Sequence, residues 1–200
     1  MGRSVQLPAP GRGAYDRSLS RVERDQEHRE RLFRATSELL REGTLTVTRI
    51  VQHAGVGRST FYEFFDSPEH LLEQLEQRAL KRIEAELEAA LAEARTPLER
   101  LRALTRRFIA ALEAAPDDAR AVLGKLSQDG KLSLAGELLH RALQRSVATA
   151  RAEGFWFKST DEISVLAAAA AAEAIGRRHL ASPVRNVAPL LAEVIVKLLR

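Results

Sequence analysis

The stretch TVTRIVQHAGVGRSTFYEFFDSPEHLL, residues 46–72, decides the fold. Its pattern predicts two short helices separated by the turn Gly55-Val56-Gly57. The small side chain of Ala54 lets the two helices cross closely, and Gly55 can adopt the positive φ that such a turn requires. We expect Val56 to fill the small core between the helices. Two short helices joined in this way are typical of a helix-turn-helix motif.

The second short helix, Arg58 to Phe65, is predicted to have an apolar face and a polar face. Its aromatic residues Phe61, Phe64 and Phe65 are expected to pack against the first helix of the domain. The outer face then carries Arg58, Ser59, Thr60, Tyr62 and Glu63. Hydroxyl and guanidinium groups at a helix N-terminus suit phosphate oxygens and base edges. This face is therefore a candidate for entering the major groove of double-stranded DNA.

At this point the sequence resembles the DNA-binding domain of the tetracycline-repressor (TetR) family. The residues that carry the resemblance are Ile50, Ala54-Gly55-Val56, Ser59-Thr60-Phe61-Tyr62, Phe64-Phe65, Ser67 and Leu71-Leu72. The rest of the chain is similar to the family only in architecture, as a helical C-terminal region of the right length. The resemblance implies a regulator that binds DNA through the first region and a ligand through the second.

The resemblance also implies roles for individual residues. Thr46, at the cap of the first short helix, would contact a phosphate, and Tyr62 would reach a phosphate through its hydroxyl. Glu63 lies where side chains face the groove and could accept a hydrogen bond from a cytosine amine. The DNA-binding residues predicted in this way are Thr46, Thr48, Arg49, Gly57, Arg58, Ser59, Thr60, Tyr62, Glu63 and His70.

Two positions depart from the family's pattern. Gly57 stands where the family often has Ser, so the recognition helix is expected to lack a side-chain cap. Pro68 stands where the family often has a Lys that contacts phosphate. His70 or the N-terminal amides of the helix that Pro68 opens could replace that contact.

Capping signals divide the remaining sequence into helices. Capping boxes are predicted to begin at Ser20, Thr96 and Ser159. Ser67 followed by Pro68 predicts a long helix that ends near Ala94. The last helix is expected to begin near Ala188, with a proline in its first turn.

These signals predict an all-α fold of about nine helices, with an N-terminal three-helix helix-turn-helix domain and a C-terminal helical domain. The predicted organisation is a disordered basic arm over residues 1–19, a helix-turn-helix domain over 20–66 and a ligand-binding and dimerisation domain over 67–200. The formal net charge of +4 is uneven, because residues 1–21 carry +3 and residues 22–66 carry −1. DNA recognition would therefore depend on a few placed groups, with the arm adding long-range attraction.

Composition excludes several other classes of protein. The 200 residues include no cysteine, which excludes a disulfide framework, a thiolate metal site and a Cys nucleophile. The five histidines show no HxxxH or HExxH spacing, and no Gly-rich phosphate loop is present, so we expect no metal, no cofactor and no enzyme activity. No secretory signal is visible, and the longest apolar run, residues 165–172, is too short to span a bilayer. We expect a cytoplasmic protein with no membrane partner.

Two further predictions concern the C-terminal region. The region could bind a small, largely apolar effector. The residues that could line its pocket are Phe108, Leu112, Leu126, Leu139, Leu143 and Trp156. Trp156 could equally anchor a surface loop or contact a second subunit. Six consecutive alanines, Ala167 to Ala172, would allow a close helix–helix seam, and the apolar residues around them predict a homodimer through the last two helices.

The sequence thus predicts a ligand-responsive DNA-binding transcriptional regulator. We expect a repressor that binds a palindromic operator as a dimer and is released by its effector. The alternatives are a helical protein-interaction module with vestigial DNA binding and, less in keeping with the motifs, a small helical enzyme. Sequence-specific DNA binding separates the first hypothesis from the other two.

Overall fold

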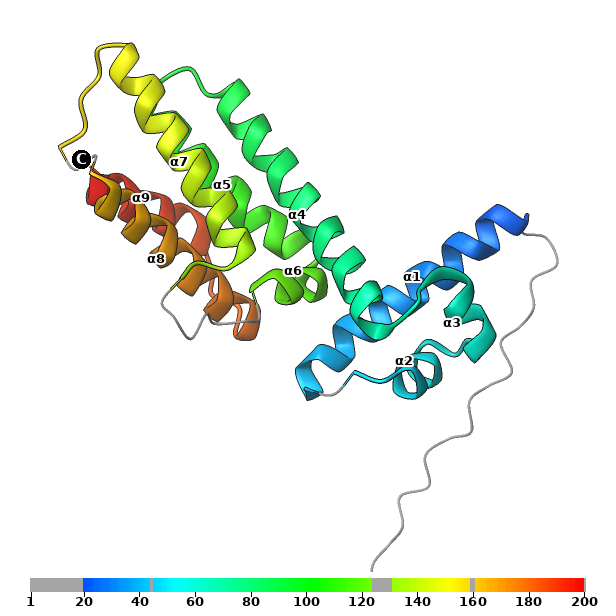
Figure 1. The fold of residues 1–200 in the computed structure, drawn as a ribbon. Helices are drawn as coiled ribbons and strands as arrows, with labels where there is room; N and C mark the ends of the chain where they lie inside the picture. Colours follow the sequence, from blue (N-terminus) through cyan, green and yellow to red (C-terminus); the bar gives the residue numbers. More distant parts are fainter. Residues whose placement is uncertain (1–19, 44, 124–130, 159–160, 200) are drawn as a thin grey trace, which may run out of the picture. The chain divides into compact units, whose positions relative to one another are not determined.

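The computed structural model describes residues 20–43, 45–123, 131–158 and 161–199. The predicted arm, residues 1–19, and the predicted pocket residue Leu126 lie outside the described residues. The described residues form nine α-helices, one short 3₁₀ segment and no strand, which confirms the all-α prediction (Figure 1). The chain divides into two compact units, residues 1–73 and 74–200.

The first unit contains three helices and the first turns of a fourth. The bounds are α1 Arg21–Leu39, the 3₁₀ segment η1 Leu40–Glu42, α2 Val47–Ala54, α3 Arg58–Phe64 and α4 Pro68–Glu93. The Ser20 hydroxyl accepts a hydrogen bond from the Glu23 amide at 3.3 Å, and the Glu23 carboxylate accepts one from the Ser20 amide at 2.7 Å. This capping box begins α1 at the predicted place.

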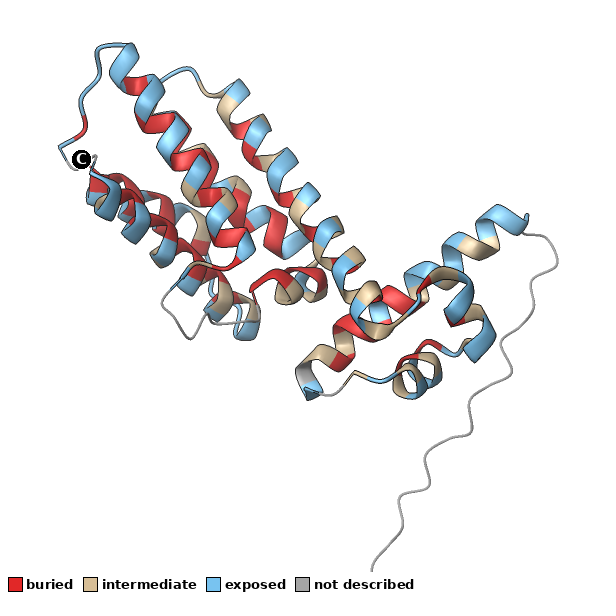
Figure 2. Ribbon diagram, viewed as in Figure 1, coloured by how far each residue is buried: buried red, intermediate tan, exposed pale blue. Residues whose placement is uncertain are grey.

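Apolar side chains from all four helices build the core of the first unit. Figure 2 marks the buried residues of these helices in red. Its almost completely buried members include Leu32, Ile50, Phe61, Phe65 and Leu71. The rings of Phe33 and Phe65 meet edge to face with their centroids 5.5 Å apart, and those of Phe61 and Phe65 are 5.8 Å apart. Aromatic contacts of this kind add to the free energy gained by burial. They hold α3 and the residue after it against α1.

The second unit is a helical bundle arranged around α5. Its further helices are α5 Pro97–Ala114, α6 Pro116–Leu123, α7 Leu134–Ala152, α8 Glu162–Ala181 and α9 Val187–Leu199. Helix α5 packs against α6, α7, α8 and α9, and its inward side chains Leu101, Leu104, Phe108 and Ile109 are fully buried. In Figure 2 the buried residues follow the inner face of each helix, as amphipathic helices require.

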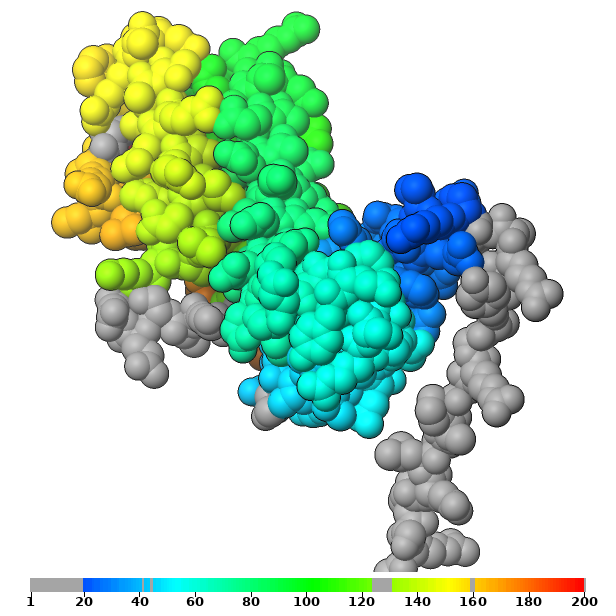
Figure 3. Space-filling view, turned by 45° about the vertical axis from the view of Figure 1, so that its right-hand side comes forward, coloured from blue at the N-terminus to red at the C-terminus, as the bar shows by residue number. Residues whose placement is uncertain are grey.

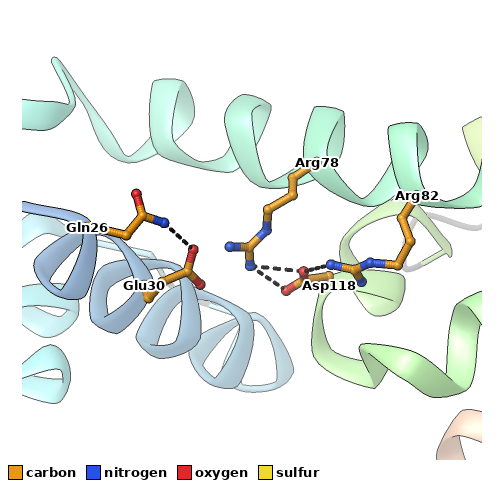
Figure 4. Close-up of polar contacts among 5 residues, drawn as sticks. All are labelled: Gln26, Glu30, Arg78, Arg82 and Asp118. Carbon is orange, nitrogen blue, oxygen red and sulfur yellow. Dashed lines mark hydrogen bonds and ion pairs between the residues drawn. The ribbon is translucent and has the colours of Figure 1, made fainter. Parts of the chain in front are cut away.

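A charged cluster joins α4 to α6 within the second unit (Figure 4). Nη2 of Arg78 donates to both carboxylate oxygens of Asp118 at 3.0 and 2.9 Å, and Nη2 of Arg82 donates to one of them at 3.3 Å. The Asp118 carboxylate is buried, so these two guanidinium groups compensate the cost of removing it from water. The same figure shows Gln26 donating to Glu30 at 3.3 Å within α1.

The predicted start signals are confirmed for α5 and α9 but not for α8. Thr96 and Glu99 form the expected capping box, and Pro189 lies in the first turn of α9. The cap of α8 is Asp161 and not Ser159, which lies outside the described residues. The Asp161 carboxylate accepts from both the amide and the hydroxyl of Ser164, at 2.9 and 2.7 Å. Asp and Ser are both preferred N-caps, and here both hydrogen bonds are made to a charged acceptor.

Candidate nucleic-acid interface

Helix α2 begins and ends at the predicted residues. The Thr46 hydroxyl accepts from the Arg49 amide at 3.3 Å and caps the N-terminus. Gly55 ends the helix in the left-handed conformation, with φ of 63°, as the turn requires. The amides of Gly55 and Val56 return to the carbonyls of Gln52 and Val51 at 3.3 and 3.1 Å. The helix-turn-helix geometry predicted from the sequence is therefore present.

Aromatic residues anchor helix α3, and no side chain caps its N-terminus. Phe61 and Phe65 are buried, and the guanidinium of Arg29 lies 5.0 Å from the ring centroid of the half-buried Phe64. Gly57 is the N-cap and supplies no side-chain hydrogen bond, as the departure from the family's pattern predicted. The predicted outer residues Arg58, Ser59, Tyr62 and Glu63 are exposed, and Thr60 is partly buried.

Arg58 and Tyr62 lie together on the exposed face of α3. The guanidinium carbon of Arg58 is 5.8 Å from the centroid of the Tyr62 ring, and Nη2 donates to the Tyr62 hydroxyl oxygen at 3.5 Å. A guanidinium over an aromatic face is attracted to it and loses part of its freedom. The structure thus brings these two predicted residues together one turn apart, with the phenol 48 % exposed.

The other predicted contacts have neighbours within the unit. Arg49 forms an ion pair with Glu42 of η1, while Thr48 is exposed on α2. His70 accepts from the backbone amide of Asp66 through Nδ1 at 3.2 Å, and its own amide donates to the Ser67 hydroxyl at 3.2 Å. His70 therefore packs on the connection between α3 and α4, and its imidazole contributes to that turn.

The sequence reasoning missed three polar contacts that hold α2 on the preceding helices. Arg31 donates to the backbone carbonyls of Ala54 and Gly55. Nε2 of His53 lies 2.7 Å from a Glu38 carboxylate oxygen, and the third contact is the pair of Arg49 with Glu42. The sequence around Arg31, Arg49 and His53 gives no sign of these partners, because only tertiary packing brings them together.

Hydrogen bonds shift the pKa of one carboxylate at the start of α4. The backbone amide of Glu69 and the Ser67 hydroxyl lower the pKa of Glu69, because both donate to its ionised form. The carboxylate is negative at neutral pH. It follows residues 22–66, whose net charge is −1.

Five of the predicted ligand-lining residues belong to the part of the chain that the structure describes, and the sixth, Leu126, lies outside it. Phe108, Leu112, Leu139 and Leu143 are at most 1 % exposed and belong to the packed core of the second unit. Trp156 is 74 % exposed and lies outside that core. Gly176 shows how tight the packing is, since a methyl group there would lie 2.8 Å from Leu112.

Hollows in the described part of the second unit lie instead at its surface. Two of them, of about 210 and 310 Å³, adjoin between α4 and α7 and share Glu84, Leu138 and Arg141. Figure 3 shows the two helices side by side, α4 in green and α7 in yellow. Charged residues make up most of the lining of the smaller hollow, whereas the larger one, which includes Leu80 and Leu134, is more apolar.

Helices α8 and α9 carry an apolar face that is left exposed by the helices the structure describes. Its large exposed members are Ile163, Leu166, Leu190, Val194 and Leu198, with Ile163 77 % and Leu190 61 % exposed. On α8 they are accompanied by the exposed small residues Ala167, Ala170 and Ala174. The two helices pack side by side (Figure 1).

Neither a metal site nor a membrane span is found in the parts of the chain that the structure describes. No group of three or more His, Asp or Glu side chains in those parts is arranged to hold a metal ion. No described helix combines the length and the apolar character that crossing a membrane demands.

Comparison with solved structures identifies the fold. A TetR-family regulatory protein from Rhodococcus RHA1 superposes with a TM-score of 0.68 at 17 % identity, over 86 % of this chain and 96 % of that one. The fatty acid degradation regulator FadR from Bacillus halodurans gives 0.67 at 18 %, over 86 % and 94 %. FadR from Bacillus subtilis in complex with stearoyl-CoA gives 0.64 at 19 %, over 85 % and 96 %. No family model and no curated protein matches the sequence.

These likenesses confirm the expected architecture. The chain has the fold of the TetR-family transcriptional regulators over most of its length. The likeness therefore includes helices of the C-terminal bundle, in which the sequence contains no motif, as well as residues 46–72.

Proposed function

We propose that this chain is a TetR-family transcriptional regulator that binds double-stranded DNA through α2 and α3. The observation that carries the proposal is the two-sided build of α3. Its inner face is fixed by Phe61 and the adjoining Phe65, while Arg58 and Tyr62 stand paired on the outer face. A rigid helix with an outward guanidinium and phenol suits recognition of base edges and phosphates.

The exposed apolar face of α8 and α9 supports a homodimer. The large side chains of α9 can pack against the small residues Ala167, Ala170 and Ala174 of α8 when a two-fold axis brings α9 of one subunit onto α8 of the other. Two helix-turn-helix units related by such an axis would bind half-sites of a palindromic operator, about 34–36 Å apart or a related distance.

An effector that contains an apolar chain fits the second unit best. One similar structure is described as a fatty acid degradation regulator, and another, FadR from Bacillus subtilis, is in complex with stearoyl-CoA. We propose a long-chain acyl compound for this chain, entering at the hollows between α4 and α7 and displacing packed side chains of the core. The protein would then act as a repressor that the effector releases, with α4 continuing from the first unit into the second.

The proposal is tested by selection from a random duplex library with the purified full chain. Sequenced pools should converge on an inverted repeat, and stearoyl-CoA, but not free CoA, should release the enriched duplex. Pools that never converge would remove the DNA-binding proposal and leave a protein-interaction module. Release by neither compound would remove the acyl effector alone.

A further inference from the structure

Arg31 joins the middle of α1 to the turn between α2 and α3. Its Nε donates to the carbonyl of Ala54 at 2.9 Å, and its Nη2 donates to the carbonyl of Gly55 at 2.7 Å. Both acceptors are backbone atoms of the turn, 23 and 24 residues further along the chain. The hydrogen bond to Ala54 is partly buried and so is protected in part from water, whereas the hydrogen bond to Gly55 is exposed.

Two other carbonyls near the end of α2 accept hydrogen bonds from backbone amides of the turn. The carbonyls of Val51 and Gln52 accept from the amides of Val56 and Gly55. The carbonyls of Ala54 and Gly55 accept from Arg31, which also places a positive charge at the negative end of the helix. A methyl group on Gly55 would lie 2.7 Å from Nη2 of Arg31, so the guanidinium occupies the space beside the turn.

The same turn determines where α3 begins. Gly57 is the N-cap, and no side chain caps α3. The buried aromatic anchors of α3 are Phe61 and the residue that follows the helix, Phe65. The N-terminal turn, with Arg58 and Ser59 exposed, therefore takes its direction from the backbone of Gly55 to Gly57, which Arg31 holds.

We infer that Arg31 is a positioning residue for DNA recognition, acting through the turn and not through contact with DNA. The inference rests on the proposed function. Two of its guanidinium nitrogens are already committed to Ala54 and Gly55. Loss of the side chain would leave two carbonyls without their charged donor and let the start of α3 change direction.

The test compares Arg31→Met with Arg34→Met, an exposed position on the same helix that loses the same charge. Affinities are measured for the duplex enriched by the wild-type chain and for an unrelated duplex, each over a range of salt concentrations. Arg31→Met should weaken specific binding about ten- to a hundredfold, as expected for two hydrogen bonds from a charged donor. Its salt slope should equal that of the wild type, because no phosphate contact is lost. Arg34→Met should leave the preference between the two duplexes unchanged.

Three outcomes would overturn the inference. The first is an Arg31→Met variant that keeps the wild-type preference between the duplexes, and the second is an Arg31→Met variant whose salt slope falls by the amount of one phosphate contact. The third is an Arg34→Met variant that loses specific affinity as much as Arg31→Met does. Amide hydrogen exchange supplies the structural readout, with faster exchange expected at residues 56–60 while residues of α1 remain protected.

If Arg31→Met fails to fold, Arg31→Lys decides, because lysine keeps the charge but cannot span both carbonyls in the fork geometry of arginine. Arg31→Lys should lose specific affinity without losing its salt slope, and wild-type affinity in Arg31→Lys would overturn the inference.

Failure of the proposed function would look different. In that case the wild-type chain itself would show no preference between duplexes, and the comparison of variants would not arise.

Discussion

At the scale of single residues, the recognition surface depends on the pairing of Arg58 with Tyr62. The phenol ring restricts the guanidinium and leaves its own hydroxyl at the surface, so the pair offers donors in a defined arrangement. Preorganised donors lose less entropy on binding than free side chains do. Because the ring and the hydroxyl of Tyr62 have different roles in this pair, substitutions can test Arg58 and the Tyr62 hydroxyl separately.

Arg58→Ala should reduce affinity for the enriched duplex by about tenfold or more, because it removes a charged donor in the proposed interface. Tyr62→Phe keeps the ring under Arg58 and removes only the hydroxyl, so we expect a smaller loss of about two- to tenfold. Fluorescence anisotropy with a labelled duplex measures both. Arg106→Ala, at an exposed position on α5, is the control for loss of charge. Wild-type affinity in both α3 variants would contradict the proposed surface.

Some of the candidate site could be predicted residue by residue, and some could not. The caps at Ser20 and Thr46 and the φ of Gly55 follow from local rules, and the structure agrees with them. The hydrogen bonds of Arg31 could not be predicted, because both partners are backbone carbonyls more than 20 residues away. The exposure of Trp156 could not be predicted either, because only the tertiary fold determines which aromatic side chain of its loop packs into the core.

At the scale of helices, ion pairs tie α5 to its neighbours. Arg100 near the start of α5 donates to both carboxylate oxygens of Glu153, the C-cap of α7, with the Nη1 contact at 3.0 Å. Arg100 is buried, and its hydrogen bonds lower the pKa of Glu153. Arg102 likewise lowers the pKa of Glu193 on α9 through a hydrogen bond of 2.8 Å.

The lowered pKa of Glu153 predicts how stability changes with pH. The ionised form is favoured in the folded state, so its contribution is complete above the ordinary glutamate range near pH 4.5 and is lost as pH falls through the lower folded value. Glu153→Gln should therefore make the urea midpoint fall less steeply from about pH 6 to about pH 3.5. Glu84→Gln, at an exposed position on α4, should retain the wild-type slope. Equal slopes for Glu153→Gln and the wild type would contradict the role of this pair.

Helix boundaries could be predicted where one capping signal stood alone. Thr96 with Glu99 began α5 at the expected residue, whereas four polar residues before α8 offered several caps and the prediction chose the wrong one. The outcome depended on Asp161 reaching both donors of Ser164, which local spacing does not reveal. The all-α class was predictable because amphipathic spacing repeats in every segment.

At the scale of the whole molecule, the proposed dimer explains why α8 and α9 expose large apolar side chains. A face of this kind on a monomer costs solubility and is typical of an interface. The double variant Leu190→Lys, Val194→Lys places two charges on it and should convert a dimer to a monomer without unfolding the chain. Sedimentation equilibrium measures the mass, and circular dichroism checks the helices.

The control is Val22→Lys, because Val22 is an exposed apolar residue on α1, away from α8 and α9 in the sequence. It should leave the mass unchanged. A wild-type chain that sediments as a monomer, or a double variant that keeps the wild-type mass, would contradict the proposed interface. Loss of mass in the control would show that the effect is not specific to α8 and α9.

The most direct test of the central claim is an equilibrium titration of the wild-type chain against the duplex it enriches and against a scrambled duplex of equal length. At physiological salt the account predicts at least a thousandfold tighter binding to the enriched duplex, in complexes of two chains per duplex. Equal affinity for the two duplexes would contradict the claim that α3 reads DNA sequence.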